Sequence, residues 1–135
     1  MSKHQGQFNL LKTMTGIKRI ISFGGWAFSP EAPTYNIFRT GVTPANRNLL
    51  ATNVANFVNE HGLDGVDFDW EYPAAPGLPD IPDIPRGILQ EGQDHLEFLK
   101  AVKRRLRDKT FSIAAPASYW YLKGYPMKEI GAVVD

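Results

Sequence analysis

Apolar residues recur along the chain at two spacings, one typical of strands and the other typical of helices. Across residues 63–72 apolar and acidic residues alternate one by one, which predicts a strand with two different faces. Residues 18–23 and 111–115 are short, mostly apolar runs bounded by Gly24 and Pro116, and they predict two further strands. Between the strands, apolar residues three or four positions apart predict two amphipathic helices. Their apolar stripes are Leu50, Val54, Phe57 and Val58 in the first helix and Leu96, Leu99, Val102 and Leu106 in the second.

Residues that begin and end helices set the expected boundaries. Thr43 is the expected N-cap of the first long helix, with Pro44 at its first helical position, and Gly62 is its expected C-cap. The second long helix is expected to start near residues 93–94 and to end in the basic cluster 103–107, which complements the helix dipole. Residues 5–14 and 126–134 predict two shorter helical segments, and residues 26–42 predict a loop.

Strands that alternate with helices predict an α/β fold with a parallel sheet. Two parallel strands joined by a helix form a right-handed crossover, so the three strands are expected to lie side by side. The loop from residue 73 has a proline at every third position up to residue 85, which is the period of a polyproline II helix. This loop either walls one side of a cleft or serves only as a spacer, and the sequence favours neither.

Composition narrows the possible partners. The chain has 135 residues, no Cys and a formal net charge of +1, so nucleic acid is not an expected partner. No apolar run approaches the roughly 20 residues of a membrane span, so no membrane partner is expected, and the first residues lack the apolar stretch of a signal peptide.

The alternation in residues 63–72 places three carboxylates on one face of the central strand. Asp67, Asp69 and Glu71 would follow one another at about 6–7 Å, the repeat of two strand residues. Burial and mutual repulsion both disfavour charge, so we expect coupled titrations in which one pKa is raised. Glu71 is nearest the strand end and is therefore the best-placed proton donor.

Other chemistries have less support. An acidic run is more often a solvated face or a cation site, but the bulky Val66, Phe68 and Trp70 between the acids favour a half-buried strand over a calcium loop. The chain has no Gly-x-Ser-x-Gly motif and no Cys, and its three His show no zinc-ligand spacing. We therefore expect no metal and no cofactor.

Glycine and aromatic residues follow the predicted strands at the end where parallel-sheet enzymes bind substrate. Gly24 and Gly25 allow a ligand or a neighbouring backbone to approach closely, or simply form the turn into the next segment. Trp26 and Phe28 follow them, and either could stack on a sugar ring or pack beneath the loop. A second aromatic group, also a candidate sugar platform, contains Tyr119, Trp120, Tyr121 and Tyr125.

Two motifs resemble one enzyme family. The residues Asp64-x-x-Asp67-x-Asp69-x-Glu71 match every acidic position of the signature of the family 18 chitinases, and Ser22-Phe23-Gly24-Gly25 matches that family's Ser-x-Gly-Gly motif. The proline-rich loop is similar to that of the fungal members. The resemblance implies a (β/α)₈ barrel, which takes about 250 residues, so the whole chain, 1–135, is expected to be an incomplete catalytic domain with roughly strands three to five.

The resemblance also implies a reaction and its residues. The substrate would be chitin or a chitooligosaccharide, hydrolysed with retention, with Glu71 as the general acid. The acetamido oxygen of the substrate would be the nucleophile, Asp69 would hold the acetamido N–H, and Asp67 would share a proton with Asp69. Asp64 lies on the other face by strand parity and is expected to be structural. Expected substrate-binding residues are Ser22, Gly24, Gly25, Trp26, Tyr72, Tyr119 and Trp120.

Three questions stay open at this stage. The resemblance favours cleavage within the polymer but leaves the exo mode open, and it implies secretion although no signal peptide is visible. A chitin-binding lectin on the same scaffold is an alternative, which the presence of Glu71 disfavours. An inactive truncated product is the other alternative, because three strands leave two sheet edges unpaired.

Overall fold

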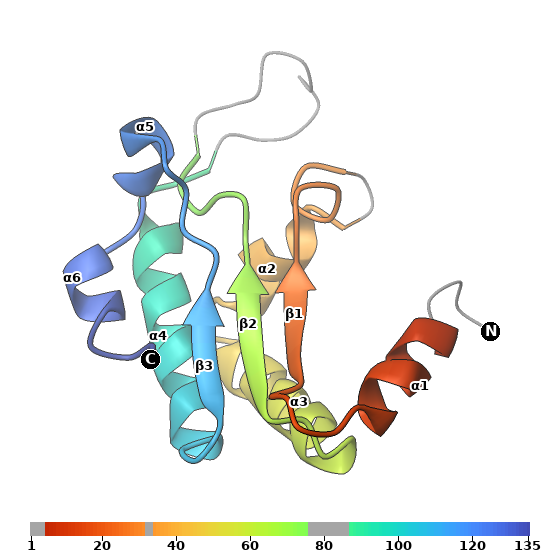
Figure 1. Cartoon of the computed structure of the whole chain (residues 1–135). Helices are drawn as coiled ribbons and strands as arrows, with labels where there is room; N and C mark the ends of the chain where they lie inside the picture. Colours follow the sequence, from red (N-terminus) through yellow and green to blue (C-terminus); the bar gives the residue numbers. More distant parts are fainter. Residues whose placement is uncertain (1–4, 32–33, 76–86) are drawn as a thin grey trace.

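The computed structural model describes residues 5–31, 34–75 and 87–135, and its centre is a parallel sheet of three strands (Figure 1). The strands are β1 (Ile20–Gly24), β2 (Gly65–Asp69) and β3 (Thr110–Ile113), in the order β1-β2-β3. β1 and β3 lie within two residues of the predicted start and end, whereas β2 begins two residues after its predicted start and ends three residues before its predicted end. The register pairs Ser22 with Asp67 and Asp67 with Ser112.

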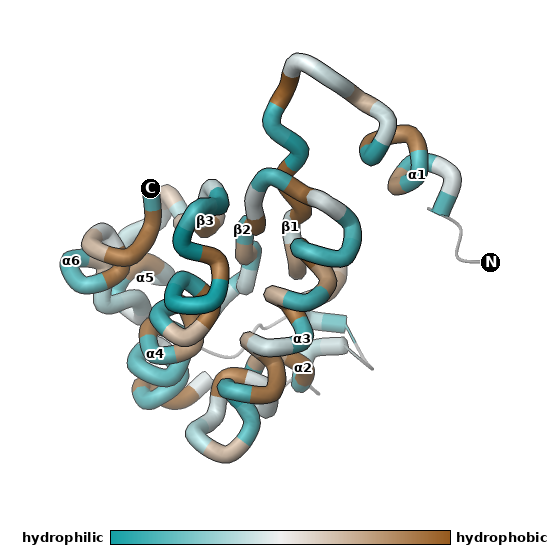
Figure 2. Tube along the Cα trace, turned by 90° about the horizontal axis from the view of Figure 1, so that it is seen from below, coloured by the Kyte–Doolittle hydropathy of each residue, from teal (hydrophilic) through white to brown (hydrophobic). Residues whose placement is uncertain are grey.

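Six helices are described, and three of them, α2, α3 and α4, share one side of the sheet. Helices α2, α3 and α4 lie behind the sheet in Figure 1, and the view from below places them on the same side (Figure 2). In the described part of the chain, the opposite face of the sheet carries no covering helix. The helices are α1 (Gln5–Thr13), α2 (Asn36–Gly41), α3 (Arg47–Glu60), α4 (Gln90–Arg105), α5 (Tyr119–Leu122) and α6 (Met127–Ile130).

The core lies between β2 and the helices. Val66, Phe68 and Trp70 are at most 2% exposed, which confirms the predicted alternation along the central strand. Phe68 contacts the rings of Phe98 and Phe111, with centroids 5.0 and 5.8 Å apart. Burial of these side chains fixes the register, because a slip of one residue would turn all three toward the opposite face.

The predicted start of the first long helix is wrong. Helix α3 begins at Arg47, and the Thr43 hydroxyl donates to the carbonyl of Thr40 (2.8 Å) instead of capping a helix. The amides of Asn46 and Arg47 both donate to the Thr43 carbonyl, so residues 43–46 form a turn. At the other end, Gly62 has a φ of +61° and the Leu63 amide donates to Val58 (3.0 Å), which confirms the glycine C-cap.

Other boundaries also differ from the predictions. Residues 26–42 are not only a loop, since they contain α2, whose Phe38 is 5% exposed and stacks against Trp70. Helix α4 begins at Gln90, three residues before the predicted start, and α5 forms within the predicted aromatic segment. Most of the proline-rich loop, residues 76–86, lies outside the described residues.

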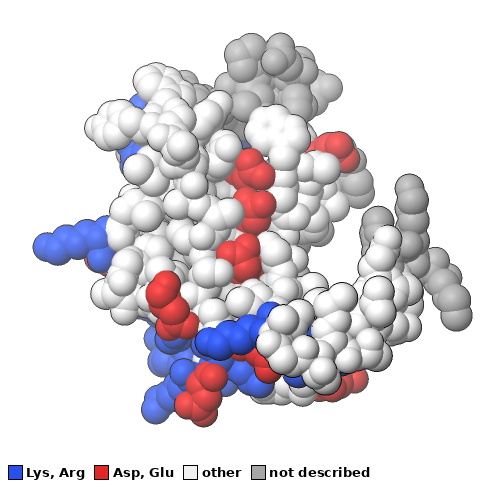
Figure 3. Space-filling view, viewed as in Figure 1, with Lys and Arg blue, Asp and Glu red and all other residues white. Residues whose placement is uncertain are grey.

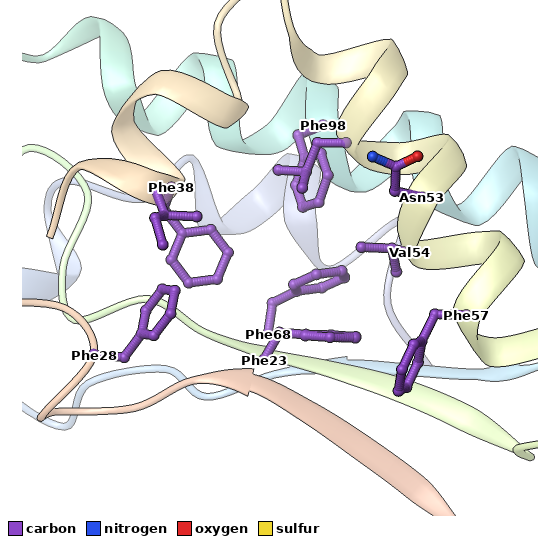
Figure 4. Close-up of a pocket in the computed structure, with 10 residues that line it drawn as sticks. Phe23, Phe28, Phe38, Asn53, Val54, Phe57, Phe68 and Phe98 are labelled. Atoms are coloured by element: carbon purple, nitrogen blue, oxygen red, sulfur yellow. The ribbon is translucent and has the colours of Figure 1, made fainter. Parts of the chain in front are cut away.

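An apolar hollow of about 270 Å³ lies on the helix side of the sheet (Figure 4). Aromatic side chains from β1, β2, α2, α3 and α4 line it, and its one polar lining residue is Asn53. It carries no charged group, so we interpret it as a gap in the packing of the core. No helix in the described ranges is both long and apolar enough to span a membrane.

Candidate active site

The acidic side chains lie on the face of the sheet that the helices leave open. In Figure 3 acidic side chains form a column up the middle of this face, along the central strand. Asp67, Asp69 and Glu71 are all partly exposed, whereas the alternating Phe68 and Trp70 are buried. The strand alternation therefore brings the three predicted carboxylates together on an accessible surface.

Asp67 is held by hydroxyl groups from both neighbouring strands. The Ser22 hydroxyl on β1 donates to Oδ2 of Asp67, and the Ser112 hydroxyl on β3 donates to Oδ1, each at 2.7 Å. Both serines are the direct register partners of Asp67. Ser22 was predicted as a site residue, whereas Ser112 was not.

Asp69 lies against the glycine pair of β1. A Cβ atom on Gly24 would come within 2.0 Å of the Asp69 carbonyl oxygen, and the Gly25 amide donates to that oxygen at 2.7 Å. Both glycines have positive φ, +118° and +105°, which side-chain-bearing residues rarely adopt. The backbone of Asp69 therefore makes the close approach that was predicted, and the predicted turn is also present, because the Gly25 carbonyl accepts from the Phe28 and Ser29 amides.

The raised pKa expected in the acidic row is found at Asp69. Burial raises the pKa of this carboxyl, and the neighbouring negative charges of Glu71 and Asp67 raise it further. A raised pKa favours the protonated form of Asp69, which can donate a hydrogen bond.

Glu71 follows the end of β2 and is held from both sides. Its amide donates to the Ser29 hydroxyl oxygen at 2.9 Å, and its side chain is hydrogen-bonded to the Tyr72 phenol. Burial and then this hydrogen bond raise the pKa of Tyr72 to about 12, so the phenol stays protonated. Asp69, Glu71 and Tyr72 line an open hollow of about 230 Å³, which residues 114–116 close on the β3 side.

A buried tyrosine supports the backbone just before Glu71. The Tyr125 hydroxyl donates to the Trp70 carbonyl at 2.6 Å, and Tyr125 is 6% exposed. Tyr125 is therefore too buried to be a sugar platform, and that prediction is wrong. The His95 ring packs edge-on against the rings of Trp70 and Tyr125. Burial lowers the pKa of His95 to about 3.

The other end of the acidic motif serves a different purpose. Asp64 accepts hydrogen bonds from the Arg19 amide (2.8 Å) and side-chain Nε (2.9 Å). These bonds lower the pKa of the Asp64 carboxyl, mainly through the side-chain bond. Asp64 ties the start of β2 to the start of β1, as expected for a structural residue.

The candidate platform aromatics differ in exposure. Trp26, Tyr119 and Trp120 are 51%, 79% and 55% exposed, whereas Phe28 packs edge-on against Phe38 with centroids 5.6 Å apart. Tyr72 and Tyr121 stack on each other at 4.4 Å, so each ring covers the other.

Within the described ranges, no group of three or more His, Cys, Asp or Glu is arranged to hold a metal ion.

The site brings three carboxyls together in three different surroundings. Its groups are a partly exposed carboxyl beside a hollow, a second carboxyl with a raised pKa, and a third that two hydroxyls bind. This arrangement can donate a proton and stabilise positive charge, which are the requirements of acid-assisted cleavage of a glycosidic bond.

Comparison with known proteins gives consistent matches. Secreted chitinase LysM12 of Penicillium expansum is 59% identical over 129 residues, which are 96% of this chain and 8% of that protein. Probable chitinase LysM18 of the same fungus is 54% identical over 132 residues, 96% of this chain and 9% of that protein. The chain therefore spans less than a tenth of these relatives.

A solved structure matches the whole chain. The chitinase domain of the spore coat protein CotE from Clostridium difficile superposes with a TM-score of 0.78 at 26% identity, covering 100% of this chain and 38% of that one. The parallel strands and their helices are thus part of a (β/α)₈ barrel, as predicted. The sequence profile described as Glycosyl hydrolases family 18 matches residues 2–135, and the chain belongs to that family.

Proposed function

We propose that this chain forms part of a chitinase active site and that Glu71 is its general acid. The observation that carries the proposal is the position of Glu71, at the carboxyl end of the central parallel strand and beside a hollow that Asp69 and Tyr72 also line. Catalytic residues of (β/α)₈ enzymes lie at this end of the strands. The substrate class comes from the names of the relatives, which are described as chitinases.

The mechanism uses a single protein carboxyl as acid and the substrate as nucleophile. Glu71 protonates the glycosidic oxygen as its bond to the anomeric carbon breaks, and the acetamido oxygen of the same sugar attacks that carbon. Water then opens the resulting oxazolinium ion with retention, and Glu71 recovers its proton. Most glycosidases use a second carboxylate as nucleophile or base, and family 18 is a known exception to this scheme. Asp69 therefore needs no nucleophilic role.

The remaining acids support this step. Asp69, with its raised pKa, hydrogen-bonds the acetamido group, and it becomes negative by passing its proton to Asp67 when positive charge develops. Asp67, which two hydroxyls hold in place, shares that proton with Asp69. Trp26, Tyr119 and Trp120 are exposed aromatic residues that can stack on sugars, and Lys123 lies over one face of the Trp120 ring, 3.6 Å from its centroid. Gly24 and Gly25 shape the floor beside Asp69.

We further propose that this segment acts outside the cell and has little turnover alone. LysM12 is described as secreted, which supports the first point. The second follows from the open acidic face, since a catalytic site needs walls that exclude water from the reacting atoms (Figure 3). Turnover by the 135-residue chain close to that of a complete chitinase would refute this second point.

The test places the segment in a closed barrel. Residues 5–135 replace the matched part of the CotE chitinase domain, and hydrolysis of a fluorogenic N-acetylglucosamine oligomer is followed. Glu71→Gln should lower kcat at least about 10²-fold, the usual contribution of a general acid, and leave oligomer binding unchanged. The control Glu129→Gln changes an exposed acid on α6 and should not alter kcat.

The outcome also separates the alternatives. A chimera that binds the oligomer but turns over none, with or without Glu71, would favour the lectin. Equal turnover by the Glu71→Gln and parent chimeras would refute Glu71 as the acid.

A further inference from the structure

A hollow lined by cations lies on the helical layer, away from the acidic row of the central strand. It has a volume of about 290 Å³ and lies between the C-terminal part of α4 and the segment that follows α6. Figure 1 shows α6 and the end of the chain beside α4. Its lining residues are Lys100, Lys103, Arg104, Arg107, Ala132 and Val133.

Helical spacing brings the cations together. Lys100, Lys103 and Arg104 are three or four positions apart on α4 and share one face of the helix, and Arg107 follows just past its end. Both lysines are partly exposed and both arginines are exposed. The helices of a (β/α)₈ barrel form its outer ring, so this hollow remains accessible when further strands join the edges of the sheet.

The two lysines already bind carboxylates, whereas the two arginines do not. Lys100 pairs with Glu97 at 2.8 Å, and Lys103 pairs with Asp135 at 2.6 Å. Arg104 and Arg107 form no ion pair or hydrogen bond with any residue in the described ranges. Four cations against two carboxylates leave an excess of two positive charges, of which the C-terminal end of the α4 dipole offsets about half a charge.

Neighbouring basic residues have acceptors within the protein instead. Arg105 donates to the Ala101 carbonyl (2.7 Å) and to the Thr52 hydroxyl (3.2 Å), and Lys109 donates to the Leu63 carbonyl (2.8 Å). Neither of these basic side chains lines the hollow. They stabilise the fold, whereas the two arginines of the hollow have their donors available for a ligand.

We propose that the hollow binds the phosphate group of a small soluble phosphate monoester, with Arg104 and Arg107 as its main ligands. Guanidinium groups bind phosphate oxygens through two parallel N–H donors. A phosphate monoester carries about −1.5 to −2 charge at pH 7, which matches the positive excess of the hollow. Ala132 and Val133 give the organic part of the molecule an apolar surface to contact. Free phosphate shares this chemistry and is the other source of the bound group.

This site is independent of the proposed chitinase function. The hollow shares no residue with the one that Asp69, Glu71 and Tyr72 line. Its test therefore needs no chitin substrate, and its failure would leave the role of Glu71 unaffected.

The test follows the ³¹P transverse relaxation of glucose 6-phosphate added to the 135-residue chain at constant ionic strength. Relaxation should increase with a Kd of the order of 1 mM, because exposed ion pairs contribute little each. Inorganic phosphate should displace the ligand, whereas glucose should not. Unchanged relaxation, or displacement by glucose, would overturn the proposal.

Two further probes distinguish the sources of the phosphate. Binding of inorganic phosphate without binding of glucose 6-phosphate would overturn the monoester. A phosphoserine peptide that binds at least about tenfold more tightly than glucose 6-phosphate would overturn the assignment to a small molecule.

Arg104→Gln and Arg107→Gln should each weaken binding about fivefold, and the double variant should weaken it at least about tenfold. The matched control is Arg105→Gln, which removes the same charge one position away from a side chain that the protein itself binds. It should leave the Kd within about twofold of the parent value. Equal weakening by Arg104→Gln and Arg105→Gln would indicate general attraction to a basic surface and would overturn the site.

The same titrations in the barrel chimera cover the case in which the 135-residue chain does not stay folded in solution. The chimera closes the edges of the sheet, and circular dichroism checks that each variant is folded. The difference between Arg104→Gln and Arg105→Gln should appear there as well. Its absence in the folded chimera would equally overturn the proposal.

Discussion

The hydroxyl of Tyr125 and the carbonyl of Trp70 form a 2.6 Å hydrogen bond between residues 55 positions apart, one residue before the proposed acid. Both residues are buried, so water cannot replace the bond. It links the segment after β3 to the end of β2. The Glu71 amide of the same peptide unit donates to the Ser29 hydroxyl, so both polar groups of the Trp70–Glu71 peptide are held by hydrogen bonds.

Tyr125→Phe should lower the free energy of unfolding by about 1–3 kcal/mol, because the Trp70 carbonyl loses its partner in a buried place. Urea denaturation followed by fluorescence measures this. Tyr119→Phe removes the same hydroxyl from a side chain that is 79% exposed and should change the free energy by less than about 0.5 kcal/mol. Equal effects of the two variants would mean that the Tyr125 bond adds nothing.

Gly24→Ala should be far more damaging than Gly16→Ala. Both positions have positive φ, but nothing lies within 4 Å of a Cβ on Gly16, whereas a Cβ on Gly24 would reach within 2.0 Å of the Asp69 carbonyl oxygen. Gly16→Ala therefore isolates the conformational cost of about 1–2 kcal/mol. Gly24→Ala adds a backbone clash, and we expect a loss of at least about 3 kcal/mol or an unfolded chain in the same denaturation assay. Similar losses would contradict the close β1–β2 contact.

His95 should make the fold sensitive to moderate acid. Burial lowers the pKa of His95 to about 3, so the unfolded chain binds a proton near the ordinary value of 6.5 while the folded chain does not. Stability that is present above pH 6.5 is therefore lost as the pH falls toward 3, at up to about 1.4 kcal/mol per pH unit. His95→Leu should flatten this slope between pH 6.5 and 4. The difference between the two chains at pH 8 measures packing alone, and an unchanged slope would show that His95 is not the cause.

Asp69 should act in the opposite direction. Because its folded pKa is raised, the stability it contributes is complete below the ordinary value of 3.8 and is lost as the pH rises through the folded value. Asp69→Asn cannot ionise, so it should be more stable than the parent at pH 7, and the gap should close in acid. Thermal unfolding at pH 7 and pH 3 measures both points, and a variant less stable than the parent at pH 7 would contradict the burial of this charge.

The sequence predicts the sheet well because period-2 alternation is read directly from adjacent residues. The two faces of the central strand can be predicted without tertiary information, because apolar Val66, Phe68 and Trp70 alternate with acidic Asp67, Asp69 and Glu71. The order of strands and helices then implies the parallel crossover. The predicted start of α3 is wrong because a Thr-Pro pair is found in turns as well as at helix starts. Here the Thr43 side chain bonds back to Thr40, so the turn forms.

The supporting residues of the site depend on tertiary placement. Ser112 lies opposite Asp67 only once the register between β2 and β3 is known, although the serine at the centre of the third predicted strand was the available signal. Tyr125 carries no such signal. It lies in an aromatic run in which Tyr119 is exposed and Tyr125 is buried, and only the packing of that segment against Trp70 distinguishes the two.

The most direct measurement of the role of Glu71 compares leaving groups in the barrel chimera. Protonation matters most when the leaving group is a poor one such as a sugar alcohol, and least when it is a stable anion such as dinitrophenolate. Glu71→Gln should therefore slow hydrolysis of N-acetylglucosamine oligomers at least about 10²-fold more than it slows release of dinitrophenolate from the matching aryl glycoside. Equal losses for both substrates would contradict proton donation by Glu71.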